Sequence, residues 1–185
     1  MLKQADPVEG SYPPPVVASP ANIFPSASCL SSFANELIPA ISPLTKTLPY
    51  TVDSTLLNEA QCSIPSVDSK LTINQPTGNF FYDSWEIKEE FKGTVWETVL
   101  NTLPLDIGEA RLIVLGHGTT YMSHTDIDDR YHLSIKGQYS FLINVDDEKM
   151  YPTVADGQWY EMNTGLRHVA ANFGSYDRAQ LVVRK

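Results

Sequence analysis

The chain has 185 residues, of which 42% are hydrophobic and 10% aromatic. A chain of this length and composition suits one compact domain with a hydrophobic core, and it is too short for two full domains. The formal net charge is -9, and the 13 Lys and Arg residues form no basic run, which argues against nucleic acid or an anionic membrane surface as a general partner.

The N-terminal stretch MLKQADPVEG is polar, and no run of about 18 apolar residues occurs anywhere in the chain. We therefore expect a soluble, unexported, cytoplasmic protein. The two cysteines, Cys29 and Cys62, lack the spacing of a metal-binding pair. This favours free thiols in a reducing compartment, and a Cys29–Cys62 disulfide is the alternative.

Prolines are concentrated in the first part of the chain, where 11 of the 13 precede Asn79. Each proline removes a backbone donor and fixes φ, so long regular elements are disfavoured there. We expect residues 1–78 to be a mostly irregular segment of extended pieces and short helical turns packed on the core, with residues 1–20 disordered. Residues 79–185 are the expected main domain.

Two adjoining short helices are predicted after Gly78. In DSWEIKEEFKG (83–93), Asp83 and Glu86 have the spacing of a capping box, and Gly93 ends the pattern. In TVWETVLNTLP (94–104), Thr94 and Glu97 repeat the capping signal ahead of an apolar face that ends at a proline.

From residue 109 onward the apolar residues recur with a period of two, which indicates strands. Gly, Asp and Asn turn signals separate the runs. The seven strand-like runs are 109–116, 130–137, 138–145, 150–154, 158–162, 167–173 and 179–185. Seven short strands at this spacing predict an all-β core, an antiparallel sandwich or barrel.

All four histidines lie in this β region, and three polar residues stand out by their spacing. His124 and Asp126 are two residues apart, so in extended backbone their side chains leave the same face and can hold one metal ion. His168 lies on a later strand and could complete a facial triad of two histidines and one carboxylate, an arrangement that suits non-haem Fe(II). A lone histidine, however, is more often a satisfied polar residue than a ligand.

Arg178 follows His168 by ten residues, at the head of the last strand run. A guanidinium in an otherwise apolar strand offers a permanently charged fork that matches a carboxylate, which indicates a dicarboxylate ligand. The alternative is a surface ion pair with Asp177 or another carboxylate.

Residues 85–185 resemble the aspartyl/asparaginyl β-hydroxylase family, which includes bacterial proline hydroxylases and belongs to the Fe(II)- and 2-oxoglutarate-dependent oxygenases. The matching stretches are GTTYMSHTD (118–126), RYHLSI (130–135), DGQWYEMNTGLRHVAAN (156–172) and DRAQLVV (177–183). The resemblance implies a double-stranded β-helix, a jelly-roll or cupin-like fold, over residues 79–185, with two short helices and the irregular Pro-rich segment.

The resemblance also implies roles for individual residues. His124, Asp126 and His168 match the iron ligands, and Arg178 matches the partner of the distal carboxylate of 2-oxoglutarate. The family motif R-x-H, which faces the other carboxylate of that cofactor, is matched by Arg130 and His132; here the alternative is that Arg130 pairs with Asp128 or Asp129.

Three further comparisons with the family pattern bear on the site. Asn172 matches an H-x-x-x-N motif that fixes the end of a strand. Ile113 stands where some members carry a Ser that shares the distal carboxylate, which puts that second contact in doubt. The link from His124 to Arg130 is shorter than in the eukaryotic members, which argues against transferring their protein substrate.

The implied activity is hydroxylation of an amino acid or a peptide side chain with O2, releasing succinate and CO2. Tyr121, Trp159 and Tyr160 lie near the motifs and are candidate substrate contacts, although aromatic residues in a β-barrel are more often core. Two other readings remain open: a cupin-like metal-binding barrel without 2-oxoglutarate chemistry, and a non-enzymatic β-sandwich interaction module.

Overall fold

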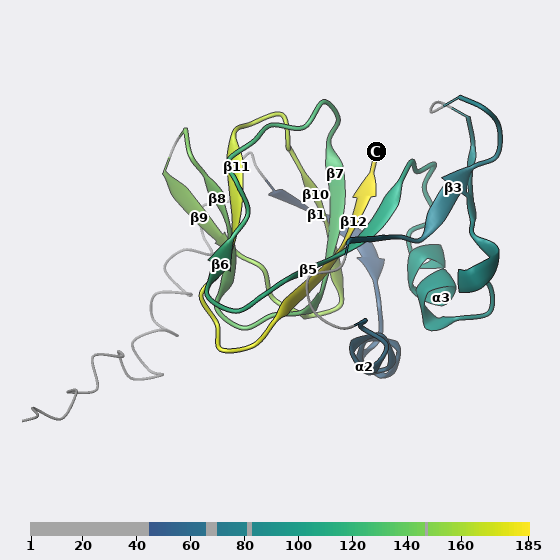
Figure 1. The fold of residues 1–185 in the computed structure, drawn as a ribbon, viewed down its shortest axis with the longest axis horizontal. Coiled ribbons are helices and arrows are strands. Elements are labelled where there is room, and N and C mark those ends of the chain that lie inside the picture. Colours follow the sequence, from purple (N-terminus) through teal and green to yellow (C-terminus); the bar gives the residue numbers. More distant parts are fainter. Residues whose placement is uncertain (1–44, 66–69, 81–82, 147) are drawn as a thin grey trace, which may run out of the picture. The chain divides into compact units, whose positions relative to one another are not determined.

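The computed structural model describes residues 45–65, 70–80, 83–146 and 148–185 (Figure 1). The helical elements are α2 (Ser54–Cys62), the single 3-10 turn η1 (Glu89–Phe91) and α3 (Val95–Asn101). The strands are β1 (Thr45–Thr51), β2 (Lys70–Thr72), β3 (Asn74–Pro76), β4 (Trp85–Ile87), β5 (Ala110–Leu115), β6 (Thr119–Thr120), β7 (Arg130–Lys136), β8 (Ser140–Asn144), β9 (Lys149–Pro152), β10 (Gln158–Met162), β11 (His168–Asn172) and β12 (Arg178–Arg184).

Two antiparallel sheets make up the body of the fold. The larger has six strands in the order β1-β10-β7-β12-β5-β2, and the smaller has four in the order β6-β11-β8-β9. In Figure 1 the two sheets stand opposite each other, and from β5 to β12 the chain passes back and forth between them, as in a jelly roll, with only β8 and β9 consecutive in one sheet. β3 and β4 pair separately as a two-stranded ribbon. The predicted double-stranded β-helix is therefore confirmed.

The two faces of the six-stranded sheet have opposite characters because side chains alternate along each strand. On β12, for example, Ala179, Leu181 and Val183 are fully buried in the main hydrophobic core. That core also contains residues of both helices, so α2 and α3 cover this face (Figure 1). The intervening residues of β12 point to the opposite face, between the sheets, where they line a cavity.

The strand predictions agree with the structure. Each of the seven runs contains a strand, β5 and β7 to β12, with ends that differ by at most two residues from those predicted. The two-residue strand β6, at Thr119–Thr120, was not predicted because it is too short to show a period.

The helix predicted over residues 83–93 is wrong in its first half. Trp85–Ile87 forms strand β4, and the Glu86 carboxylate accepts from the side chain of Gln75 across the ribbon instead of capping a helix. The Asp83 side chain accepts from the amide of Phe80, three residues earlier in the chain. Only η1 remains helical there, whereas the second predicted helix is present as α3.

The described part of the Pro-rich segment is more regular than its prolines indicate. β1 and β2 form the two edges of the six-stranded sheet, where a missing backbone donor is tolerated, and Pro49 lies within β1. Between them, α2 begins at an N-cap in which Asp53 Oδ1 accepts from the amides of Thr55 and Leu56. The expectations for residues 1–44, including Cys29, lie outside the described residues.

Neither helix in the described ranges is long and apolar enough to cross a bilayer.

Asn172 fixes the end of β11, the role suggested by its position four residues after His168. Its buried Nδ2 donates to the carbonyls of Leu115, Gly116 and Tyr176 at 2.8–3.1 Å, and its Oδ1 accepts from the Gly174 amide. These bonds tie the end of β5 to the turn that leads into β12. They therefore fix the place where Arg178 enters the sheet.

A candidate metal centre and its pocket

The backbone brings two of the predicted ligands together. His124, in the loop after β6, forms an antiparallel bridge with His168 at the start of β11. Each amide donates to the other residue's carbonyl, at 3.1 Å for His124 and 2.9 Å for His168. The separation of the two rings, 4.4 Å between centroids, therefore depends on paired backbone as well as on side-chain packing.

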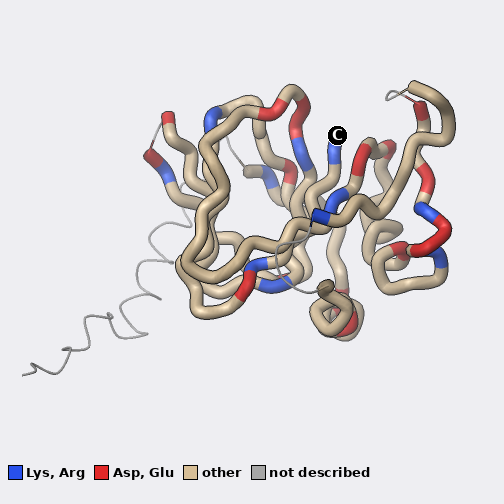
Figure 2. The backbone as a smooth tube through the Cα atoms, in the orientation of Figure 1, with Lys and Arg blue, Asp and Glu red and all other residues tan. Residues whose placement is uncertain are grey.

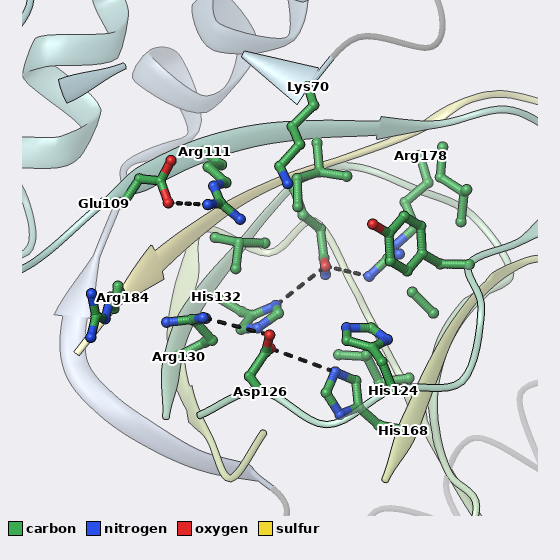
Figure 3. A pocket seen from close by; sticks show the side chains of 17 residues that line it. Lys70, Glu109, Arg111, His124, Asp126, Arg130, His132, His168, Arg178 and Arg184 are labelled. Atoms are coloured by element: carbon green, nitrogen blue, oxygen red, sulfur yellow. Dashed lines mark hydrogen bonds and ion pairs between the residues drawn. The ribbon is translucent and has the colours of Figure 1, made fainter. Parts of the chain in front are cut away.

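Asp126 completes a cluster of three possible ligands. One nitrogen of each histidine and one oxygen of Asp126 all lie within 4.8 Å of one another. The Asp126 amide donates to the carbonyl of Thr164 at 2.8 Å, which anchors the loop against the segment before β11. Figure 3 shows the three side chains converging on one side of the pocket.

The hydrogen bonds of the two rings fit a metal centre. His124 Nδ1 lies 2.8 Å from the carbonyl oxygen of Met122, and His168 Nδ1 lies 2.8 Å from that of Leu166. Because a carbonyl oxygen only accepts, each Nδ1 carries the proton, and each Nε2 is left with its lone pair free for a cation. Burial lowers the pKa of His168, which also favours the neutral ring that a metal ion requires.

Arg130 is oriented by a predicted metal ligand. Its guanidinium Nη2 lies 3.5 Å from Asp126 Oδ1, so the alternative pairing with Asp128 or Asp129 is not what the structure shows. Asp128 instead pairs with Arg184 at 2.5 Å. Arg130 Nη1 is buried and has no hydrogen-bond partner in the described part of the chain.

Arg178 lies at the other end of the pocket, at the start of β12. Only 4% of the residue is exposed, and no carboxylate of the described residues pairs with it, so the surface ion pair with Asp177 is excluded. Its Nη2 donates to Gln180 Oε1, and its Nε has no partner. Burial lowers the pKa of Arg178 to about 10, so the group remains a cation at neutral pH.

His132 lies on β7 between the two arginines and faces the same cavity, as its spacing from Arg130 predicted. Its Nδ1 lies 3.4 Å from Gln180 Oε1, and its Nε2 is buried without a partner among the described residues. Burial, reinforced by the nearby Arg178 charge, lowers the pKa of His132 to about 3.

The low pKa of His132 predicts a specific pH dependence of stability. The unfolded chain takes up this proton near pH 6.5, whereas the folded chain does so only near pH 3, so acid favours unfolding within that window. Wild type should therefore lose roughly 3 kcal/mol of unfolding free energy relative to His132→Gln between pH 7 and pH 4. Urea unfolding of both proteins measures this difference, and parallel pH curves would contradict the assignment.

The pocket between the sheets has a volume of about 300 Å³ and is lined by residues from β2, β5, β7, β8, β11 and β12 and by the loop that carries His124 and Asp126. Buried polar atoms without a partner gather here. Four of the five found among the described residues are Arg111 Nε, Arg130 Nη1, His132 Nε2 and Arg178 Nε, all on lining residues. Unpaired buried donors are costly, so the three guanidinium nitrogens of this set fit an anionic ligand.

The three aromatic residues expected near substrate have different positions. Tyr121 lines the pocket and packs edge-on against His124. Trp159 does not line it: the side chain is fully buried in the core on the other face of the sheet, where Nε1 donates to Thr102. Tyr160 is not among the lining residues, and its hydroxyl donates to Asp156 at 3.0 Å. Trp159 was therefore wrongly expected to contact substrate.

Several polar lining residues were not predicted from the sequence: Lys70, Glu109, Arg111, Gln180 and Arg184. Gln180 and Arg184 share the period of two that starts at Arg178, so the strand pattern contained that signal. Lys70 belongs to a stretch that the prolines marked as irregular. Ile113 also lines the pocket, which leaves an apolar side chain where some oxygenases carry a Ser.

No family model matches the sequence, and neither does any curated protein. Among solved structures, an oxidoreductase of the 2OG-Fe(II) oxygenase family from Burkholderia pseudomallei is similar in fold. Its TM-score is 0.54 at 13% identity, over 84% of this chain and 88% of that one. A Pseudomonas putida prolyl-4-hydroxylase gives a TM-score of 0.45 at 12% identity, over 82% of this chain and 98% of that one. The chain thus has the fold seen in a 2OG-Fe(II) oxygenase.

Proposed function

We propose that this protein is an Fe(II)- and 2-oxoglutarate-dependent dioxygenase that hydroxylates an amino acid or a peptide side chain. The observation that carries the proposal is the placement of His124, Asp126 and His168 in one cluster beside a cavity that ends at the buried, carboxylate-free Arg178. A metal-binding barrel without a dicarboxylate co-substrate offers no reason to bury that charge.

Iron would be held by His124 Nε2, Asp126 and His168 Nε2. Two neutral imidazoles and one carboxylate form the donor set of the facial triad of non-haem Fe(II) oxygenases. When bound, Fe(II) and 2-oxoglutarate supply the oxidising chemistry: one atom of O2 enters a substrate C–H bond, the other enters succinate, and CO2 leaves. The residues around the triad supply binding and orientation.

The co-substrate would be oriented by cations at two points. Arg178 offers its free Nε–H to the distal carboxylate from a dry position, where a charge-assisted bond is strong. Gln180 holds the guanidinium in place, and Gln180 is itself held by a 2.9 Å bond from its Nε2 to Ser134 Oγ. Arg130 Nη1 is placed for the other carboxylate, nearer Asp126, and the neutral His132 ring lies on the same strand and lines the same pocket.

Within the oxygenases, the ordered motifs from residue 118 to residue 183 favour a relative of the aspartyl/asparaginyl β-hydroxylases and bacterial proline hydroxylases. The pocket volume of about 300 Å³ lies at the lower end of small-molecule sites, which favours a small substrate, such as a free amino acid, over a folded protein.

The activity is tested by incubating the purified chain aerobically with Fe(II) and 2-oxoglutarate and measuring succinate. We expect succinate in the absence of added substrate, at a low uncoupled rate, and a higher rate with some members of a panel of amino acids and short peptides. Succinate formation equal to that of a protein-free control throughout the panel would overturn the proposal.

A further inference from the structure

We infer that the pocket contains a second anion-binding subsite, separate from Arg178, which holds a carboxylate or phosphate group of a small substrate. The proposed function is the basis for assigning the bound group to a substrate. The existence of the subsite is inferred from the side chains alone. The subsite comprises Lys70, Arg111 and Arg184, from three different strands. Arg111 and Arg184 lie at the end of the cavity away from Arg178, and Lys70 lies between Arg111 and Arg178. We call these residues the cationic end of the pocket.

The cationic end lies away from Arg178 along the sheet. Arg111 is opposite Val182 in the β5–β12 register, and Arg130 is opposite Arg184 in the β7–β12 register. Val182 and Arg184 follow Arg178 by four and six residues, which is roughly 13 and 20 Å of extended strand. Figure 3 shows Arg111, Arg130 and Arg184 on one side of the pocket and Arg178 on the other. One small anion anchored at Arg178 therefore leaves the cationic end uncovered.

The charges lining the pocket do not cancel. Three arginines that line the pocket each have a carboxylate partner: Arg111 pairs with Glu109, Arg130 with Asp126 and Arg184 with Asp128. Lys70 and Arg178 add two further cations. A divalent metal ion and a dianionic co-substrate balance each other, so an excess of two positive charges remains for the substrate.

This excess occurs in a protein whose formal net charge is -9. In Figure 2 several Lys and Arg residues gather around the C-terminal end of β12, with Asp and Glu residues among them. A local positive field in an acidic protein raises the concentration of small anions at that point and directs their approach.

One donor at the cationic end is ready for an oxyanion. Arg111 Nε is buried and unpaired within the described ranges, although Nη2 of the same guanidinium is already paired with Glu109. The free N–H groups of a guanidinium match the oxygen spacing of a carboxylate or a phosphate. Lys70 extends into the pocket from the edge strand β2 and adds a mobile charge.

The test uses binding rather than turnover. The protein is loaded with Mn(II) in place of Fe(II) and saturated with 2-oxoglutarate, and its thermal unfolding temperature is measured with matched probes at 10 mM, a concentration chosen for weak ligands. The carboxylate probes are N-acetyl amino acids against their amides, and the phosphate probe is glycerol 3-phosphate against glycerol. We expect charged probes of at least one type to raise the unfolding temperature by about 3 °C and their neutral partners to leave it unchanged.

Arg111→Gln and Lys70→Gln should each remove most of that shift while keeping the separate stabilisation by 2-oxoglutarate. Lys70→Gln changes an exposed residue at a sheet edge, so this variant should fold. Its result remains usable even if Arg111→Gln, which loses the ion pair with Glu109, has a lower folding stability. The inference is overturned if no charged probe stabilises a protein that still responds to 2-oxoglutarate, or if both variants respond to the probes as wild type does.

The same data separate the two proposals. A wild-type protein that is stabilised by a charged probe but not by 2-oxoglutarate, with the probe effect lost in Arg111→Gln, supports the anion subsite and contradicts the oxygenase assignment.

Discussion

Replacing Arg178 by Met should make the protein more stable and at the same time strongly weaken its binding of 2-oxoglutarate. The guanidinium is 4% exposed and has no ion-pair partner among the described residues, so the fold bears the cost of desolvating a charge. A methionine of similar length removes that cost. His132 Nδ1, 3.4 Å from Gln180 Oε1, can then donate to the oxygen that loses its arginine.

We expect the unfolding free energy of Arg178→Met, without ligands, to exceed that of wild type by about 1–2 kcal/mol. Affinity for 2-oxoglutarate should fall by roughly 100-fold, because charge-assisted hydrogen bonding to its distal carboxylate is lost. Chemical unfolding and isothermal titration measure the two quantities. Arg167→Met is the matched control, because Arg167 pairs with Asp146 in an exposed position. Undiminished 2-oxoglutarate binding by Arg178→Met would remove Arg178 from the co-substrate site.

Replacing His168 by Ala should eliminate metal binding and succinate formation while the fold persists. The side chain provides one of three candidate ligands, and two ligands do not hold Fe(II) against water at micromolar metal. The loss of affinity should be at least about 100-fold, since removal of an outer-shell partner alone costs 10- to 100-fold. The backbone bonds between residues 124 and 168 do not involve the deleted ring.

Anaerobic titration with Fe(II) or Co(II) measures this loss, and circular dichroism verifies the fold. His117→Ala is the control, because His117 is the same residue type on the surface and is not part of the cluster. Retained tight binding by His168→Ala, or an equal loss in His117→Ala, would contradict the assignment of the triad.

The β core could be predicted from the sequence because its signal is local. Along β5 buried and less buried positions alternate, and a period of two needs only a few residues to be visible. The pair His124 and Asp126 is local in the same sense. The contact with His168 was one possibility among others until the family resemblance supported it, because residues 42 positions apart in sequence, such as Asp126 and His168, need not be in contact.

The features that were missed or misjudged depend on pairing between distant segments. The stretch 83–93 has helical spacing, but Gln75 and Asn74 offer Trp85–Ile87 a partner strand, and tertiary pairing outweighs a capping signal. Trp159 is one residue from Tyr160, yet the register with Leu133 places it on the core face. Lys70 reaches the pocket because β2 pairs with β5, a contact between segments about 40 residues apart.

The reciprocal backbone bonds between His124 and His168 have a kinetic consequence. Because both rings are held before any ion arrives, binding requires little ordering of the chain, and any opening of the loop away from β11 would pull apart two ligands of a bound ion. Amide hydrogen exchange at these two residues should therefore become slower when metal is bound, in step with the ion's own dissociation rate. The same two amides would then record how long an ion resides at the site.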